Sequence, residues 1–278
     1  MEQRNHRSVL LAAVFCLGFL GCSTDNRVAK DAAVTVLSTT IRDQAVLSAE
    51  VVAKACLDLE WSLQLVGAQN VPGAQSAWIR ARLAYDHGSA LFKLAAPELD
   101  ALIDGELDTP LTRVGLRKLE QPLFGKPTAD GLTLNQGAQG LAAAAVRLPS
   151  AMADTSRALD IGAFWGTLSG LAVVSGTKLD GSDSPFAGQS LASARALLEG
   201  IAASYEPLSG LLQPIDAALD TQIHQLLSDL LGQLRGVSST DQLADKALFL
   251  RRSADLGQAL LRVAKALGSQ TSAVVDVT

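Results

Sequence analysis

The stretch without Pro or Gly between Ala29 and Val66 restricts the fold more than any other feature of the chain. Apolar residues recur in it at spacings typical of one helix face, and they include Val34, Leu37, Ile41, Val46, Val51 and Leu57. A half-buried β-strand would instead show strict two-residue alternation. We therefore expect one long helix here, or two helices in series.

The rest of the chain continues this helical pattern. Further helices are expected over residues 74–96, 109–119, 136–158, 161–175, 189–204, 215–234 and 241–267, with Pro149 kinking or splitting the third of these. Polar connectors are expected at 98–108, 131–135 and 177–188. The sequence predicts an all-α helical domain over residues 30–268, as one bundle or two packed sub-bundles, followed by a flexible tail over 269–278.

Composition supports helices and excludes one class of partner. The chain has 278 residues, of which 48% are hydrophobic but only 4% aromatic, so Ala, Leu and Val supply most of the apolar content. The formal net charge is −5. Because phosphate binding needs clustered Lys and Arg, an acidic chain of this kind is not expected to bind nucleic acid.

The first 21 residues have the pattern of a secretory signal peptide. Arg4 and Arg7 precede an apolar run over 9–20 that is too short for an ordinary membrane-spanning helix. The run ends in Gly21-Cys22, which resembles a bacterial lipobox and implies cleavage before Cys22 and acylation of that residue. Ordinary signal cleavage beside a coincidental Cys is the alternative. We expect an outer-membrane lipoprotein facing the periplasm, anchored in the membrane at Cys22 and tethered through residues 22–29.

Several single residues are expected to have structural roles. Cys56 has no possible intrachain partner in the mature chain and lies in a helical pattern, so we expect a buried, inert thiol. Trp61 and Trp165 are expected to anchor the core, and the leucine-rich face over 219–234 to be internal. His224 is expected at the surface or at the edge of the core.

Two segments resemble the imelysin family, whose members include a periplasmic component of bacterial iron uptake. The family's Trp-x-x-Ala-Arg-x-x-Tyr segment is matched here by Trp78, Ala81, Arg82 and Tyr85. Its downstream Gly-x-His-x-x-Glu motif is matched by Gly115 and Glu120 only. The resemblance implies an all-α fold and a site shared by these two segments.

Arg117 stands where the family motif has His, and this departure bears on metal binding. In the family, the His and Glu three residues apart look like ligands on one helix face, suited to iron or another divalent metal. A guanidinium has no lone pair to give. Asp86 and Glu120 remain as candidate ligands.

Three arrangements of Arg117 stay open. Arg117 could pair with Glu120 and Asp86 and take the charge role of a metal ion. It could form an ordinary solvated helix pair with Glu120. A rebuilt metal site could draw on His87, or on Asp180 and Asp183 in the polar connector. Separately, the four-residue spacing of Trp78 and Arg82 predicts a cation–π contact.

The resemblance implies a non-enzymatic binding or accessory lipoprotein linked to iron or haem acquisition, with envelope iron-uptake proteins as partners. A scaffold or interaction lipoprotein without metal is the first alternative, and a metal-dependent peptidase is the second. The family carries a peptidase label, but the chain contains no His-Glu-x-x-His motif to supply zinc ligands and a base.

Overall fold

The structure is a computed structural model that describes residues 25–64, 71–105, 114–125, 131–154 and 161–266. Within these ranges every regular element is a helix and no strand occurs, which confirms the predicted all-α bundle. The predicted signal peptide 1–21, the acylation site Cys22 and the tail 269–278 lie outside the described residues. No helix in the described ranges combines the length and apolar character needed to cross a bilayer.

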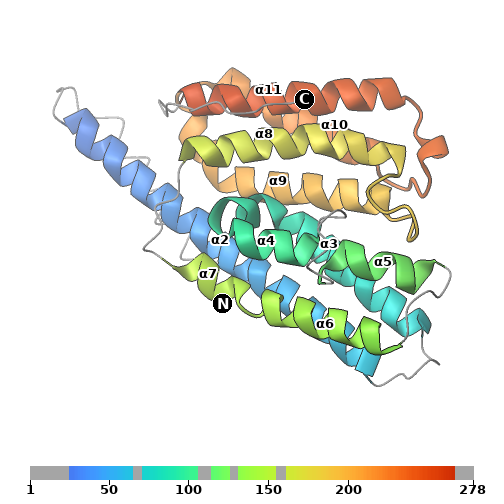
Figure 1. The fold of residues 1–278 in the computed structure, drawn as a ribbon. Helices are drawn as coiled ribbons and strands as arrows, with labels where there is room; N and C mark the ends of the chain where they lie inside the picture. The colour runs from blue at the N-terminus through green and yellow to red at the C-terminus, as the bar shows by residue number, and fades with distance from the viewer. Residues whose placement is uncertain (1–24, 65–70, 106–113, 126–130, 155–160, 267–278) are drawn as a thin grey trace, which may run out of the picture.

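The described chain forms a series of helices (Figure 1). They are α2 (Asp25–Gln64), α3 (Val71–Ala95), α4 (Pro97–Asp104), α5 (Leu116–Phe124), α6 (Gly131–Ala145), α7 (Leu148–Ala153), α8 (Ile161–Thr177), α9 (Ser190–Leu212), α10 (Ala217–Gln233) and α11 (Lys246–Ala266). Two 3-10 turns, Lys178–Asp180 and Thr240–Gln242, follow α8 and precede α11.

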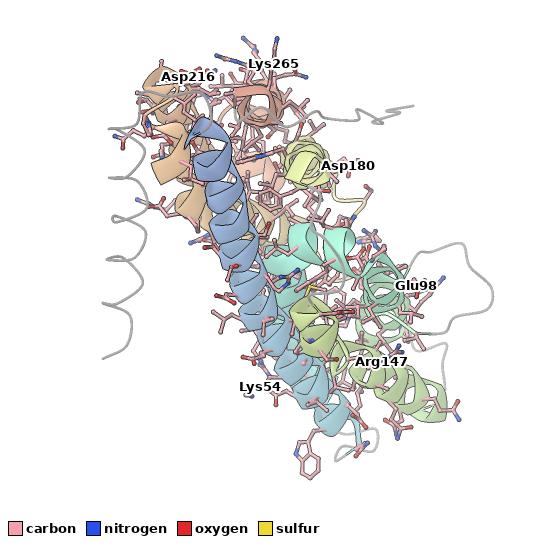
Figure 2. The ribbon with its side chains drawn as sticks, turned by 90° about the vertical axis from the view of Figure 1, so that its left-hand side faces the viewer. Lys54, Glu98, Arg147, Asp180, Asp216 and Lys265 are labelled. Atoms are coloured by element: carbon pink, nitrogen blue, oxygen red, sulfur yellow. The ribbon has the colours of Figure 1, made fainter. Side chains whose placement is uncertain are left out.

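The helices form two groups that α3 joins. In the first group α2 packs along α3, α6 and α7, and in the second α8 packs along α11 and α9, with α10 against α11. Contacts of α3 with both α9 and α8 bring the groups together. Figure 1 shows α2 running diagonally past the other helices, and Figure 2 shows Arg147 toward one end of the molecule and Lys265 toward the other.

Several predicted boundaries were wrong because proline lies in the first turn of some helices here and inside others. The connector predicted at 98–108 is in part the helix α4, with Pro97 in its first turn, where a missing N–H is harmless. Pro122 lies inside α5, and Pro207, which follows the helix predicted over 189–204, lies inside α9. Pro149 opens α7 after the break at the end of α6, so the predicted split at this residue is confirmed.

Three other boundaries also differ. Residues 131–135, predicted as a loop, form the first turn of α6. The last helix, predicted to start at residue 241, begins at Lys246, and the side chain of Asp245 accepts a capping bond from the amide of Leu248 at 2.8 Å. At the other end, α2 already begins at Asp25, within the predicted tether. The start predicted at Thr109 lies outside the described residues.

The core confirms most of the predicted structural residues. Trp165 and Cys56 are both fully buried, and burial raises the pKa of the Cys56 thiol to about 12, which makes it inert. The α10 side chains Leu219, Ile223, Leu227 and Leu230 face the interior. The prediction for Trp61 was wrong: its side chain, on α2, is 62% exposed.

One glycine sets how closely α3 and α9 approach. A Cβ built on Gly200 of α9 would lie only 1.9 Å from the carbonyl oxygen of His87 in α3. No side chain fits in that space, so glycine at this position is what allows the two backbones to cross in contact.

Candidate functional site

The two family-like segments meet because α5 is attached to α3. The indole nitrogen of Trp78 donates to the backbone carbonyl of Leu116 at 2.8 Å, and its ring meets Phe124 edge-on at 5.2 Å. Gly115, just before α5, has φ of +128°, and a Cβ there would lie 2.5 Å from the Cα of Gly105. Both the backbone angle and this close approach require glycine. The structure therefore explains why the motif has glycine at this position.

Arg82 is the centre of a buried charge cluster. Its side chain is only 2% exposed and binds Asp86 on the next turn through two nitrogens, at 3.0 and 3.1 Å. It also donates to Asp104 at the end of α4 at 2.8 Å, and to Asp183 in the connector after α8 at 3.2 Å. A planar guanidinium with five donors can serve three carboxylates at once.

Two further cations complete this cluster. Arg117 of α5 donates to Asp104 at 3.1 Å and to Asp183 at 3.0 Å. Lys178 approaches Asp183 at 2.5 Å and Asp86 at 3.5 Å. The charge cluster, as we name it, therefore consists of three cations and three carboxylates, namely Arg82, Arg117, Lys178, Asp86, Asp104 and Asp183.

Mutual neutralisation fixes the ionised forms in the cluster. Burial works to raise the pKa of Asp104, but Arg82 and Arg117 outweigh it and hold that pKa below its usual value. Burial likewise works to raise the pKa of Asp183, but Arg82 and Lys178 outweigh it and lower that pKa below its usual value. Burial would lower the pKa of Arg82, yet Asp86, Asp104 and Asp183 raise it above its usual value. Asp104, Asp183 and Arg82 are therefore charged at neutral pH.

Glu120 has a different role from the predicted one. Its Oε1 accepts from the backbone amides of Phe186 at 3.0 Å and Ala187 at 2.9 Å. Among the described ion pairs, Arg117 bonds Asp104 and Asp183 and has none with Glu120, so the predicted Arg117–Glu120 pair was wrong. The physical reason is that the connector after α8 offers Glu120 two amides and offers Arg117 a carboxylate.

Tyr85 lies beside the cluster and links it to α4. Its hydroxyl donates to Asp100 at 2.7 Å. Burial raises the pKa of Asp100 to about 6, against the opposing effect of the Tyr85 hydrogen bond. The Arg82 guanidinium lies 5.6 Å from the centre of the Tyr85 ring, so the cation–π partner of Arg82 is Tyr85 rather than the predicted Trp78.

The residues of the cluster do not fit a metal ion of the family kind. All three of its carboxylates accept from cationic side chains, and Arg117 brings a positive charge to where a metal would need a ligand. In the described ranges no three or more His, Cys, Asp or Glu side chains are grouped so that they could hold a metal. Asp86 and Glu120 as a pair of ligands stay a prediction, which their present partners do not favour.

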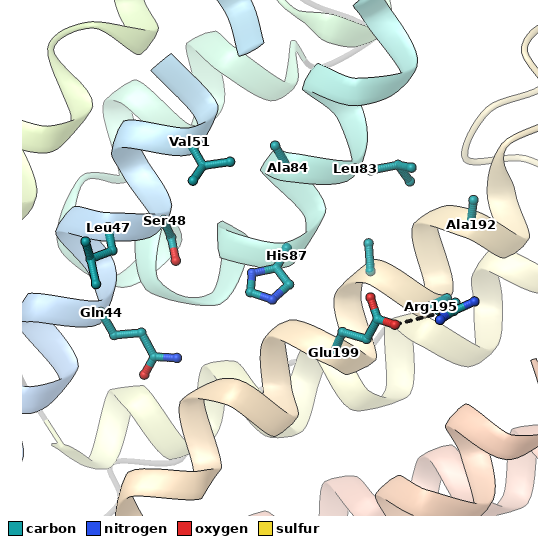
Figure 3. A pocket seen from close by; sticks show the side chains of 11 residues that line it. Gln44, Leu47, Ser48, Val51, Leu83, Ala84, His87, Ala192, Arg195 and Glu199 are labelled. Atoms are coloured by element: carbon teal, nitrogen blue, oxygen red, sulfur yellow. Dashed lines mark hydrogen bonds and ion pairs between the residues drawn. The ribbon is translucent and has the colours of Figure 1, made fainter. Parts of the chain in front are cut away.

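A second candidate site, the groove, lies between α2, α3 and α9. It encloses about 710 Å³, and its lining is mainly apolar. The lining residues are Gln44, Leu47, Ser48, Val51, Leu83, Ala84, His87, Ala192, Arg195, Ala196 and Glu199. Figure 3 shows His87 between α2 and α9, with the Arg195–Glu199 ion pair across from it. Burial lowers the pKa of His87, with Glu199 opposing, so the imidazole is neutral at pH 7.

His224 occupies a surface position, as predicted. Its Nε2 lies 3.1 Å from the Ser209 hydroxyl and 3.6 Å from Asp220. Because one ring nitrogen faces both groups, the three residues lack the relay geometry of a hydrolytic triad, in which the two nitrogens serve different partners. Asp180 lies on a turn, where it accepts from the amide of Ser182 at 2.7 Å and does not join the cluster.

Sequence comparison adds no family to these observations. The chain matches no protein-family model, and no curated protein is significantly similar to it. The two sites therefore rest on their geometry alone.

Sequence reasoning missed half of the charge cluster. The sequence predicts Asp104 and Lys178 only as residues of polar connectors, and Asp183 only as a possible metal ligand. The sequence does carry one indication of this part of the cluster, namely Gly181 between Lys178 and Asp183 and Gly188 shortly after them. Both glycines have a left-handed backbone, which lets the connector turn sharply.

Proposed function

We propose that this chain is a non-enzymatic lipoprotein of the cell envelope, with a binding or accessory role in iron or haem acquisition. In this proposal a network of salt bridges replaces the metal site of the imelysin-like proteins that the chain resembles. The observation that carries it is the mutual neutralisation of Arg82, Arg117 and Lys178 by Asp86, Asp104 and Asp183. A permanently charged guanidinium supplies the positive charge that a metal would supply.

Calorimetric titration of the purified protein with Fe²⁺, Zn²⁺ and Cu²⁺ tests the replacement. We expect no tight binding at the cluster, because a metal would have to displace cations that are already paired. Tight binding that is lost in both Asp86→Asn and Glu120→Ala would contradict the proposal.

Changing Arg117 tests the same idea from the other side. Arg117→His restores the family pattern, and its imidazole would face Asp104 and Asp183, which now lie 3.1 and 3.0 Å from Arg117 nitrogens. We expect the affinity for Zn²⁺ to rise on the order of tenfold or more over that of the native chain. Arg117→Met removes the same charge without adding a ligand, so it is the matched control. Its affinity for Zn²⁺ should stay that of the native chain.

The envelope location has its own test. Mass spectrometry of the protein from membranes is expected to find the amino terminus at Cys22 with acyl chains attached. Cys22→Ser should release the protein from the membrane fraction. An unmodified Cys22 in a membrane-free protein would contradict the lipoprotein part of the proposal and leave the cluster untouched.

A scaffold that binds another protein is the second candidate. It is favoured by the exposed apolar side chains of α2, where Leu47, Val51, Leu57 and Trp61 are each at least 45% exposed. Binding of neither metal ions nor haem by the purified protein would favour this candidate. Chelator-sensitive hydrolysis of unstructured peptides would instead support a metal-dependent peptidase.

A further inference from the structure

The exposed face of α2 has a regular pattern of its own. The face toward the core includes Ala45, Ala49, Val52 and Cys56. On the other side, exposed residues follow one another at alternating spacings of four and three, which is the spacing of a coiled-coil seam. We call these residues the seam, and they are Asp43, Leu47, Glu50, Lys54, Leu57 and Trp61.

The apolar members of the seam are strongly exposed to solvent. Leu47 is 63% exposed, Trp61 is 62% exposed and Leu57 is 45% exposed. Large apolar side chains gathered on one exposed helix face mark an interaction surface. Figure 2 shows α2 at the surface of the bundle, where a second helix can lie along it.

The order of the seam residues identifies the partner. In an antiparallel pair, the residues of one helix meet those of the other in reverse order. When Glu50 lies opposite the partner's Lys54, Leu47 lies opposite the partner's Leu57, because each leucine is three residues farther from the centre. A two-fold axis repeats both contacts with the copies exchanged. The seam is therefore complementary to itself.

We propose that the seam binds the seam of a second copy of this chain, with the two α2 helices antiparallel and Glu50 of each copy paired with Lys54 of the other. A charged residue in a seam costs stability but selects one register. Lys54 donates to Asp58 of its own helix at 2.8 Å, and an ammonium with three donors can serve Glu50 of the second copy as well. The inference does not depend on the proposed function, because it uses only the described residues of α2.

Charge decides against two other arrangements. A parallel pair would set Lys54 against the partner's Lys54 and Glu50 against the partner's Glu50, and like charges repel. An anionic lipid surface attracts basic helix faces, whereas two of the three charged seam residues, Asp43 and Glu50, are acidic.

The outermost level of the same register gives Trp61 a partner. It lies opposite the partner's Asp43, whose carboxylate can accept a hydrogen bond from the indole nitrogen. Next to Asp43, Gln44 and Leu47 line the groove, which offers the indole ring an apolar surface. The side chain that is exposed in one copy is then buried between two.

Sedimentation equilibrium of the purified full-length protein over a range of concentrations tests the proposal. We expect a reversible dimer. In Leu47→Lys the dissociation constant should rise on the order of tenfold or more, because both contacts between Leu47 and Leu57 are lost. Ile215→Lys is the matched control, since Ile215 is 59% exposed and lies just before α10 rather than on α2. It should dimerise as the native chain does.

Charge reversal tests the register and the orientation. Glu50→Lys and Lys54→Glu should each weaken the dimer on the order of tenfold or more, because each change sets like charges opposite one another twice. An equimolar mixture of these two variants should associate again, since every lysine then faces a glutamate of the other copy. In a parallel pair neither single change would create a new repulsion.

Three results would overturn the inference: a native chain that stays monomeric at every concentration, a dimer that Leu47→Lys leaves unchanged, or no recovery in the mixture of charge variants. Recovery in the mixture also shows that the effect of Lys54→Glu arises between copies and not from the loss of its bond to Asp58. Thermal melting of each variant checks that the fold is retained.

Discussion

Asp86 and His87 are neighbours in sequence, yet they belong to sites with opposite properties. Asp86 lies in the charge cluster, where three cations and three carboxylates are paired with one another. His87 lies at an apolar groove, where its imidazole is only half-buried. A site whose charged groups are all paired holds helices together, whereas a half-buried group at an open groove contributes little to stability. We therefore assign stability to the cluster and expect little of it from His87.

Among the variants that test this comparison, Arg82→Met should lower the free energy of unfolding most. The change keeps the length of a side chain that is 2% exposed but leaves Asp86, Asp104 and Asp183 buried with less positive charge. Breaking a buried ion pair from one side costs about 3–5 kcal/mol. We expect a loss of that order in the free energy of unfolding, measured by urea denaturation at pH 7.

Arg195→Met is the matched control for that measurement. Its partner Glu199 is on the groove side, and both side chains are more than 40% exposed. An exposed pair of this kind contributes about 0–1 kcal/mol. Equal losses in the two variants would remove the distinction between the sites.

Glu120→Ala should have the next largest effect. The change leaves the amides of Phe186 and Ala187 without their acceptor. Both bonds are part-buried, and a hydrogen bond to a charged group contributes about 1.5–3 kcal/mol. We expect a loss of about 2–4 kcal/mol in chemical denaturation. Glu120→Gln keeps a carbonyl acceptor and should recover most of this loss, whereas no recovery would mean that the charge of Glu120 matters instead.

The dependence of stability on pH should separate Asp100 from the cluster. Burial raises the pKa of folded Asp100 from 3.8 to about 6, so the stability linked to its protonation is present below pH 3.8 and is lost as the pH rises through about 6. Asp100→Asn should therefore stabilise the protein at pH 7.5 by on the order of 2 kcal/mol, and have little effect at pH 3.5.

The cluster should respond to pH in the opposite direction. The pKa values of Asp104 and Asp183 are lowered by their cations, so their contribution is present above pH 3.8 and is lost as the pH falls below it. Melting temperatures measured from pH 3 to 8 check both signs. A stability that is greatest at pH 3 would contradict the role given to the cluster.

His87→Ala should have the smallest effect on stability. Its imidazole forms no hydrogen bond in the described structure and lies at an open groove, so we expect a loss of less than about 1 kcal/mol in urea denaturation. A loss as large as that of Arg82→Met would mean that His87 contributes to holding the fold together.

Periodicity was enough to predict the fold class, but not the site. Alternation of apolar and polar residues reports which face of a helix is buried, so the all-α class, the core position of Trp165 and the inert Cys56 were all correct. The prediction that Trp61 is buried was wrong, because the exposure of a side chain on α2 depends on which helices lie alongside it. Periodicity carries no information about those neighbours.

The cluster could be predicted only in part for a related reason. Arg82 and Asp86 are four residues apart, which a helix brings together, and this pair is readable from spacing. Asp183 lies 101 positions from Arg82 and reaches it through a connector whose path depends on the packing of α8 and α9. Arg117 pairs with Asp104 and Asp183, which lie on other elements, rather than with Glu120 on its own helix. Spacing within one helix cannot predict such a pairing.

The crossing of α3 and α9 at Gly200 also controls the groove from outside it. Gly200 is not among the lining residues, yet it sets the separation of two of the three helices that form the walls. A single methyl group at this position would act as a wedge and spread those walls. The width of the groove is thus set by a residue that lies outside its lining.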